Sequence, residues 1–271
     1  MADPVTPAIT TVDLTRQFDT LTAVNRLTLS IEAGSIFGLL GPNGAGKSTT
    51  IKMLTTLLPP SSGGAQVAGF DIVREPTRVR RAIGYVPQMV SADGALTGVE
   101  NMTLSAVLYD LPKRVRAGRI TDALAFMDLA DAAHRLVRTY SGGMVRRLEI
   151  AQALLHQPAV LFLDEPTIGL DPIARHAVWG RLKESRRQFA TTILMTTHDM
   201  EEADVLCDRL GIMYRGQIAA SGSPAELKAH VGAGASLDDV FRAVAGRAIV
   251  DEDAGTFQDI SRRRRTASRL G

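Results

Sequence analysis

The residues best suited to chemistry lie in one glycine-rich segment, Gly41-Pro42-Asn43-Gly44-Ala45-Gly46-Lys47-Ser48-Thr49. Its spacing, Gly-x-x-x-x-Gly-Lys-Ser, is typical of a phosphate-binding loop, in which glycines let successive backbone N–H groups converge on phosphate oxygens at a helix N-terminus. In such a loop Lys47 reaches the β- and γ-phosphates, Ser48 coordinates Mg²⁺, and Thr49 donates a hydrogen bond near the α-phosphate. The alternative interpretation is an incidental glycine-rich turn.

Two adjacent carboxylates, Asp164 and Glu165, end an apolar segment that begins at Ala159. Such a segment predicts a buried strand, and the carboxyl edge of a parallel sheet lies beside a phosphate loop. At that edge Asp164 can hold the Mg²⁺ shell and Glu165 can polarise an attacking water. The alternative is that both side chains only cap the segment that follows.

Three other polar groups stand at predicted strand exits or helix starts. Gln88 follows a strand that ends at Pro87, and its amide could coordinate Mg²⁺, hold a water, or be a solvated loop side chain. His198 follows another strand and could bond a γ-phosphate, although a lone histidine is more often structural. Ser141-Gly142-Gly143 offers a helix N-cap with N–H groups open to an anion, or a purely structural cap.

One aromatic residue, Phe18, lies in a polar stretch between two predicted strands, Ile9–Leu14 and Leu27–Ile31. Its ring could stack on a nucleobase or plug the sheet. Considered alone, Phe18 is more consistent with a ring that packs against the sheet than with one that stacks on a base.

The elements that must position these groups alternate between strands and helices. The apolar run Ile36–Leu40 predicts a buried strand before the phosphate loop, and a helix follows from Ser48. Further strands are expected before Gln88 and Glu165 and over Thr192–Thr196. Arg215-Gly216 joins a predicted hairpin, and Ser223-Pro224 starts a helix at about Ala225. This order predicts an α/β fold with a parallel sheet.

The segment 97–137 has helical periodicity and no predicted strand, which indicates a separate helical lobe. One helix face carries Leu104, Val107 and Leu108, and another carries Ile120, Leu124, Met127 and Leu129. Beyond His230, Gly232 and Gly234 predict a connection between two structural elements. A short amphipathic helix is then predicted by the spacing of Leu237, Val240, Phe241 and Val244. Residues 247–271 are polar, with Arg262–Arg265 consecutive, and are expected to be flexible.

The composition is that of an ordinary globular chain of 271 residues, with 45% hydrophobic residues and a formal net charge of +2. That charge is too small to indicate a nucleic-acid surface. The single cysteine, Cys207, excludes an internal disulfide, and the N-terminus lacks the regions of a secretory signal. Because no apolar run approaches the roughly 20 residues of a membrane-spanning helix, we expect a cytoplasmic chain whose partner supplies any membrane part.

Taken together and in this order, the motifs resemble those of the ATP-binding subunit of an ABC transporter, over about residues 8–230. The correspondence is Gly41–Thr49 with Walker A, Gln88 with the Q-loop, Tyr140–Met144 with the signature motif, Val160–Glu165 with Walker B and its catalytic glutamate, Gly169–Pro172 with the D-loop, His198 with the switch histidine and Phe18 with the base-stacking aromatic.

Two motifs depart from the common family pattern. The signature reads Tyr140-Ser-Gly-Gly-Met144 in place of Leu-Ser-Gly-Gly-Gln, and Phe18 stands where Tyr is frequent. Neither change removes the serine or glycine donors. With Thr49–Lys52, Gly98–Asn101 and Leu237–Phe241, these variants are similar to the daunorubicin-resistance type of subunit, which partners ABC-2-type membrane proteins.

The resemblance implies a P-loop NTPase core, with a RecA-like parallel sheet and an antiparallel β subdomain, plus a helical subdomain. The ABC domain is expected at 8–230, with the helical subdomain at about 97–155. Residues 231–271 form a C-terminal extension, with a short helix at 236–245 before the flexible tail.

The resemblance also implies roles for single residues in a head-to-tail dimer. ATP held by one copy is capped by Ser141, Gly142 and Gly143 of the other, with Asp171 also at the nucleotide. Glu165, His198 and Lys47 are the expected catalytic residues, and Ser48, Gln88 and Asp164 the expected Mg²⁺ residues. A separate transmembrane permease is expected to dock on the helical lobe and hold the chain at the cytoplasmic face of the membrane. No nucleic-acid partner is expected.

The function implied is ATP hydrolysis that powers export of drugs, antibiotics or lipid-like molecules. One alternative is the ATPase of an importer, which shares every catalytic residue. Another is an ABC ATPase that acts on nucleic acid or the ribosome, although such proteins usually carry two cassettes or a long coiled coil. Kinase or GTPase chemistry would leave Ser141 and His198 without a role, and no Asn-Lys-x-Asp guanine motif is present. The sequence does not specify the transported molecule.

Overall fold

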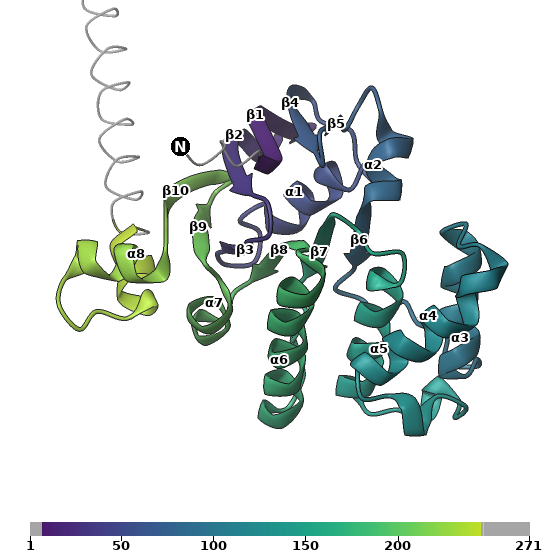
Figure 1. Cartoon of the computed structure of the whole chain (residues 1–271). Coiled ribbons are helices and arrows are strands. Elements are labelled where there is room, and N and C mark those ends of the chain that lie inside the picture. The colour runs from purple at the N-terminus through teal and green to yellow at the C-terminus, as the bar shows by residue number, and fades with distance from the viewer. Residues whose placement is uncertain (1–6, 245, 247–271) are drawn as a thin grey trace, which may run out of the picture.

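A six-stranded sheet forms the centre of the computed structural model, which describes residues 7–244 and 246 of the chain (Figure 1). Its order is β10 (Gln217–Gly222), β9 (Arg209–Tyr214), β3 (Ile36–Leu40), β8 (Thr192–Thr197), β7 (Val160–Asp164) and β6 (Ile83–Val86). All pairs are parallel except β10 with β9, which form the predicted hairpin. Every residue of β3, β7 and β8 is buried, as expected for a parallel sheet covered on both faces.

A second, antiparallel sheet lies beside the first, in the order β2 (Leu21–Glu32), β1 (Pro7–Phe18), β4 (Ser62–Val67) and β5 (Phe70–Asp71). The two predicted strands at Ile9–Leu14 and Leu27–Ile31 are parts of β1 and β2. The prediction that Phe18 lies between strands was wrong, because both strands continue to a tight turn and Phe18 pairs with Leu21.

The phosphate loop leads into α1 (Lys47–Leu54), which packs between the two sheets. The apolar face of this helix, Ile51, Met53 and Leu54, is buried with Phe37 and Leu39 of β3 in a cluster that both sheets share. α2 (Pro76–Ala82) precedes β6, and α8 (Pro224–Val231) follows β10. The helix start is therefore held on two sides by packed sheets.

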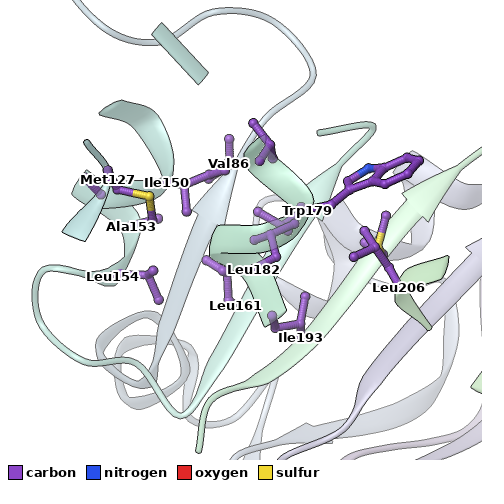
Figure 2. Close-up of a cluster of buried hydrophobic side chains, with 14 of the residues drawn as sticks. Val86, Met127, Ile150, Ala153, Leu154, Leu161, Trp179, Leu182, Ile193 and Leu206 are labelled. Atoms are coloured by element: carbon purple, nitrogen blue, oxygen red, sulfur yellow. The ribbon is translucent and has the colours of Figure 1, made fainter. Parts of the chain in front are cut away.

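Helices on the other face of the parallel sheet enclose a larger core. The long helix α6 (Pro172–Phe189) buries Val178, Trp179 and Leu182 against strand residues such as Leu161 and Ile193 (Figure 2). α7 (Met200–Leu206) adds Leu206 to this core. The helix α7 was not predicted, because its seven residues are too few to show a helical period.

The helical lobe consists of α3 (Gly98–Leu108), α4 (Lys113–Phe126) and α5 (Gly142–Leu154), with 3₁₀ turns at Ala130–Ala132 and Val137–Thr139. Figure 1 shows it to one side of the parallel sheet, beyond β6. The face with Ile120, Leu124, Met127 and Leu129 is buried. The face with Leu104, Val107 and Leu108 is exposed, with Leu108 at 72%.

A helix at 237–244 confirms the predicted short helix in the C-terminal extension. Leu237 and Val240 are buried and belong to the larger core. The predicted flexible tail with Arg262–Arg265 lies outside the described residues. Within residues 7–244 and 246, no helix has the length and hydropathy needed to cross a lipid bilayer.

Candidate active site

At two positions of the phosphate loop, Gly41 and Gly46, the neighbouring backbone leaves no room for a Cβ. Gly46 is the N-cap of α1, with φ of 103°, and no side chain caps this helix. A Cβ added to Gly46 would lie 2.4 Å from the Ala23 carbonyl oxygen, and one on Gly41 would lie 2.3 Å from that of Met213. Because the first N–H groups of a helix lack intrahelical acceptors, the loop offers a cradle of donors to an anion.

A cavity of about 500 Å³ opens along this loop. Phe18, Leu21 and Ala23 line one part of it, and Gln88 and Glu165 line another. The rest of the lining is the loop itself, from Pro42 to Thr49. An apolar side with an aromatic ring and a cradle of backbone donors suit a nucleotide, with base and phosphates bound at different places.

Lys47 is buried beneath the loop and points its ammonium at carbonyl and carboxylate oxygens. Its Nζ donates to the carbonyl oxygens of Gly41 (2.7 Å) and Pro42 (3.1 Å), and lies 3.5 Å from Glu165 Oε1. Burial lowers the pKa of Lys47, and the charge of Glu165 opposes that shift. The site therefore holds a cation where phosphate oxygens would bind the loop.

The Asp164 side chain, at the end of β7, links that strand to α1 and to β8 by hydrogen bonds. Its Oδ1 accepts hydrogen bonds from the hydroxyls of Ser48 (2.9 Å) and Thr196 (2.6 Å). A carboxylate beside a serine hydroxyl is an oxygen set that suits Mg²⁺. These residues therefore fit the predicted metal, with the ligands coming from the start of α1 and the end of β7.

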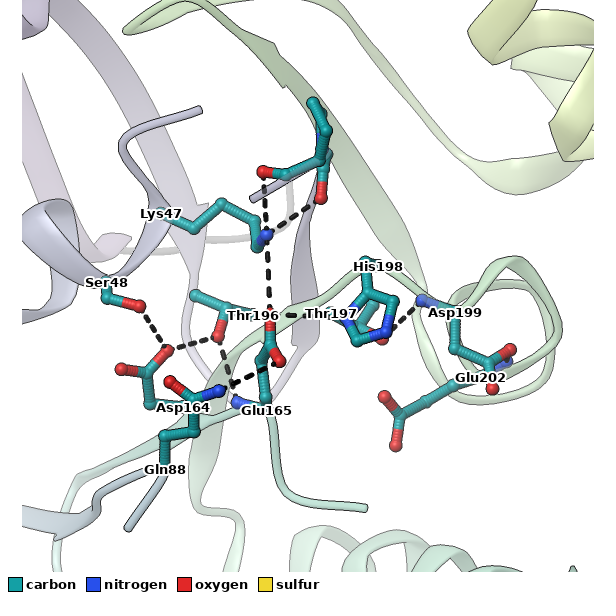
Figure 3. A network of polar contacts seen from close by, with 12 residues as sticks. Lys47, Ser48, Gln88, Asp164, Glu165, Thr196, Thr197, His198, Asp199 and Glu202 are labelled. Carbon is teal, nitrogen blue, oxygen red and sulfur yellow. Dashed lines mark hydrogen bonds and ion pairs between the residues drawn. The ribbon is translucent and has the colours of Figure 1, made fainter. Parts of the chain in front are cut away.

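Glu165 lies where the predicted catalytic side chains meet (Figure 3). Its Oε1 is 3.3 Å from His198 Nδ1, and its Oε2 accepts a hydrogen bond from the Gln88 amide at 3.4 Å. Its backbone has φ of 49°, and its N–H donates to Thr196 Oγ1 at 3.0 Å. The cap interpretation does not hold for either acid, because Asp171 caps the following helix, α6.

Four of the predicted site residues do not line the cavity at the phosphate loop. Ser141 caps α5 by accepting a hydrogen bond from the Met144 N–H, and Asp171 caps α6 through the Ala174 N–H. Gly143 packs so closely on Ala174 that a Cβ would lie 2.7 Å from the alanine methyl. Among the described residues, neither Asp171 nor any of Ser141, Gly142 and Gly143 lines the cavity. The chain therefore does not bring its signature segment to its own phosphate loop.

Sequence reasoning missed several residues that hold the site together. Thr196 bonds both Asp164 and the Glu165 backbone, yet in the sequence it is only one of the β-branched residues of a strand. Glu202 is buried on α7, and its Oε1 accepts from Thr167 (2.6 Å) and from the Trp179 indole (3.0 Å). Burial raises the pKa of Glu202. No sequence pattern marks these residues, since their partners are far along the chain.

Phe18 is 40% exposed at the mouth of the cavity, so it does not plug the sheet. The Arg16 guanidinium lies over the Phe18 ring, 4.5 Å from its centroid. Stacking on a base is worth about 1 kcal/mol, so Phe18→Ala should raise the dissociation constant for ATP about fivefold, and Phe18→Tyr should leave it unchanged. Fluorescence titration measures both. Tripolyphosphate, which has no base, should bind all three proteins equally; equal ATP affinity in Phe18→Ala would contradict the assignment.

Comparisons with known proteins agree with this geometry. The sequence profile of the ABC transporter family matches residues 24–168. The chain is 45% identical over 230 residues to the daunorubicin/doxorubicin resistance ATP-binding protein DrrA of Streptomyces peucetius, covering 84% of this chain and 68% of DrrA. It is 44% identical over 217 residues to the human phospholipid-transporting ATPase ABCA3. That alignment covers 80% of this chain and 13% of ABCA3. A solved ATP-binding subunit of an ABC transporter superposes with a TM-score of 0.78 at 30% identity, covering 88% of this chain and 99% of that one.

Proposed function

Because the chain belongs to the ABC transporter family and is an ATPase of that family, we propose that it powers an ABC-2-type system that exports drug-like or lipid-like molecules. The observation that carries the export assignment is the 45% identity to a drug-resistance subunit across 84% of the chain. The identity to a phospholipid-transporting ATPase supports the lipid-like alternative within the same class. Importers share the catalytic residues, but the relatives compared above do not favour that direction.

The proposed chemistry follows from the contacts around Glu165. Its carboxylate accepts a proton from the attacking water as the water oxygen bonds to the γ-phosphorus. The bond from that phosphorus to the β,γ-bridging oxygen breaks, so that ADP leaves, while Lys47 and His198 donate to the γ-phosphate oxygens. The loop N–H groups hold the remaining phosphate oxygens. Ser48, Asp164 and Gln88 would hold Mg²⁺, which supplies positive charge against the phosphate groups when bound.

We propose that the working form is a head-to-tail dimer. Ser141, Gly142, Gly143 and Asp171 do not line their own cavity, yet Ser141 and Gly142 are exposed at the N-terminus of α5. In the dimer the Ser141 hydroxyl and the N–H groups of Gly142 and Gly143 of one copy close on ATP in the cavity of the other, with Asp171 beside them. Each of the two sites is then completed by both copies.

The proposed permease contact is a groove of about 820 Å³ between α2 and the connection from α3 to α4. Leu108 and Val115 give it exposed apolar surface, and Arg80, Arg81 and Arg119 give it positive charge. The groove has the size and chemistry for a short membrane-protein segment with apolar and acidic side chains. Docking at this groove would place the chain at the membrane surface.

Co-purification tests this proposal. The tagged chain, isolated from membranes with ATP present, should retain a polytopic ABC-2-type membrane protein. The double variant Arg80→Glu, Arg81→Glu should reduce the recovered partner at least tenfold, because it reverses two charges at the groove. The quantity measured is the ratio of partner to tagged chain by mass spectrometry.

The matched control is the double variant Lys183→Glu, Arg187→Glu, which reverses two charges at exposed positions of α6 outside the groove and should keep the partner. Basal ATP hydrolysis by the isolated Arg80→Glu, Arg81→Glu variant should match the wild type. Recovery of ribosomal or nucleic-acid partners in place of a membrane protein would overturn the transport assignment and leave the ATPase assignment intact.

A further inference from the structure

A buried arginine on α5 connects the two segments that carry Gln88 and Glu165. Arg146 lies in the second turn of this helix, and its side chain is 7% exposed. Its Nη2 donates to the backbone carbonyl oxygens of Gln88 (3.4 Å) and Glu165 (3.2 Å). The residues whose side chains meet at the catalytic end of the cavity are therefore held through their backbones by one guanidinium.

The other donors of Arg146 extend the same connection. Nη1 donates to the Pro87 carbonyl oxygen (2.8 Å) and to Glu149 Oε2 (3.1 Å), and Nε donates to the Pro166 carbonyl oxygen (2.7 Å). A guanidinium has five N–H donors in one plane, and all five are used here. The planar group thus fixes the exit of β6 relative to the exit of β7.

Glu149 holds the far end of the segment that follows β6. It lies one turn after Arg146, its side chain is 2% exposed, and its Oε1 accepts hydrogen bonds from the Ser91 N–H and hydroxyl. Residues 87–91 are therefore attached to α5 at both ends. A fully bonded buried pair of this kind tolerates the loss of neither partner.

We propose that Arg146 is a positioning residue for ATP hydrolysis and that, with Glu149, it forms a clamp that sets the Gln88 amide against the Glu165 carboxylate. Those groups lie 3.4 Å apart. The clamp is on the helix that begins with Ser141-Gly142-Gly143. In the proposed dimer, on which this step rests, that segment closes on ATP of the second copy. Movement of α5 on closure then moves Gln88 and Glu165 of its own site.

The test compares Arg146→Lys with Arg147→Lys in the full chain. Lysine keeps the charge but offers three donors from one point, so it cannot bond both segments. Because misplacing a catalytic group by about 1 Å costs on the order of 10²-fold in rate, kcat for ATP hydrolysis should fall at least tenfold in Arg146→Lys. The ATP dissociation constant should stay within about threefold, since the phosphate loop is untouched. Arg147, which bonds the Met127 carbonyl oxygen on the lobe, should tolerate lysine without loss of rate.

A double-mutant comparison separates positioning from general damage. If Arg146 acts through Glu165, adding Arg146→Lys to Glu165→Gln should cause little further loss of rate. Glu149→Gln, which removes the charge but can still accept hydrogen bonds from Ser91, should also lower kcat, by less than Arg146→Lys, with retained ATP affinity. The proposal is overturned if Arg146→Lys keeps the wild-type kcat, if ATP affinity falls as much as kcat, or if the losses multiply in the double variant. Failure of the proposed function is a separate result, because it is read from the membrane partner and not from these rates.

Discussion

Glu165→Gln should lower kcat for ATP hydrolysis by about 10²- to 10⁴-fold, the range expected for removal of a general base, while ATP still binds. Glutamine keeps the size of the side chain and can still contact Gln88 and His198. It cannot accept a proton from water, because an amide is a far weaker base than a carboxylate. The loop N–H groups and the Lys47 ammonium, which would bind the phosphates, do not depend on that proton.

Steady-state phosphate release measures the rate, and titration with a fluorescent ATP analogue measures binding. We propose that the dimer holds together while ATP is intact and separates after hydrolysis, so Glu165→Gln should also elute at twice the monomer mass when ATP is present. Glu32→Gln, at the exposed end of β2, is the control and should match the wild type in all three measurements. A wild-type rate in Glu165→Gln would exclude Glu165 as the base.

Lys47→Met should raise the ATP dissociation constant by about 100-fold or more. Among the described residues that line the cavity, Lys47 is the one lysine or arginine, and its ammonium donates to the carbonyl oxygen of Gly41 in the loop. Methionine has a similar length and suits a position where burial already lowers the lysine pKa. The substitution therefore removes the charge while filling the space.

Thermal unfolding with and without ATP gives the readout. A ligand at 100 times its dissociation constant stabilises the folded state by about 2.7 kcal/mol, so ATP should raise the Tm of the wild type by several degrees and that of Lys47→Met hardly at all. Lys52→Met, on the exposed side of the same helix, should keep the full shift. An ATP-induced shift of wild-type size in Lys47→Met would contradict the role given to Lys47.

The strands that position the site could be predicted because burial on both faces leaves a continuous apolar run. β3 was predicted with its observed bounds, Ile36–Leu40, and β7 and β8 nearly so. The acids and His198 could be located because each follows such a run. Each of these signals depends only on residues that are close together in the sequence.

What could not be predicted depends on contacts between distant segments. Arg146 reads in the sequence as a polar residue of a helix, but the carbonyl oxygen of Pro87 that it bonds lies 59 residues away. The helix period grouped Leu104, Val107 and Leu108 on one face but could not say whether that face lies inside the lobe or on its surface. Phe18 was predicted to lie between strands because the residues before it are polar. In the structure, cross-strand pairing between β1 and β2 extends the strands through those polar residues.

Trp179 is the single tryptophan of the chain, so all indole emission comes from one buried position on α6. Its N–H bonds Glu202, which also accepts from Thr167. Thr167 lies two residues after Glu165, and Glu202 lies four residues after His198. The chain thus carries a built-in spectroscopic probe, and its polar neighbour Glu202 links the segment after Glu165 to the segment after His198.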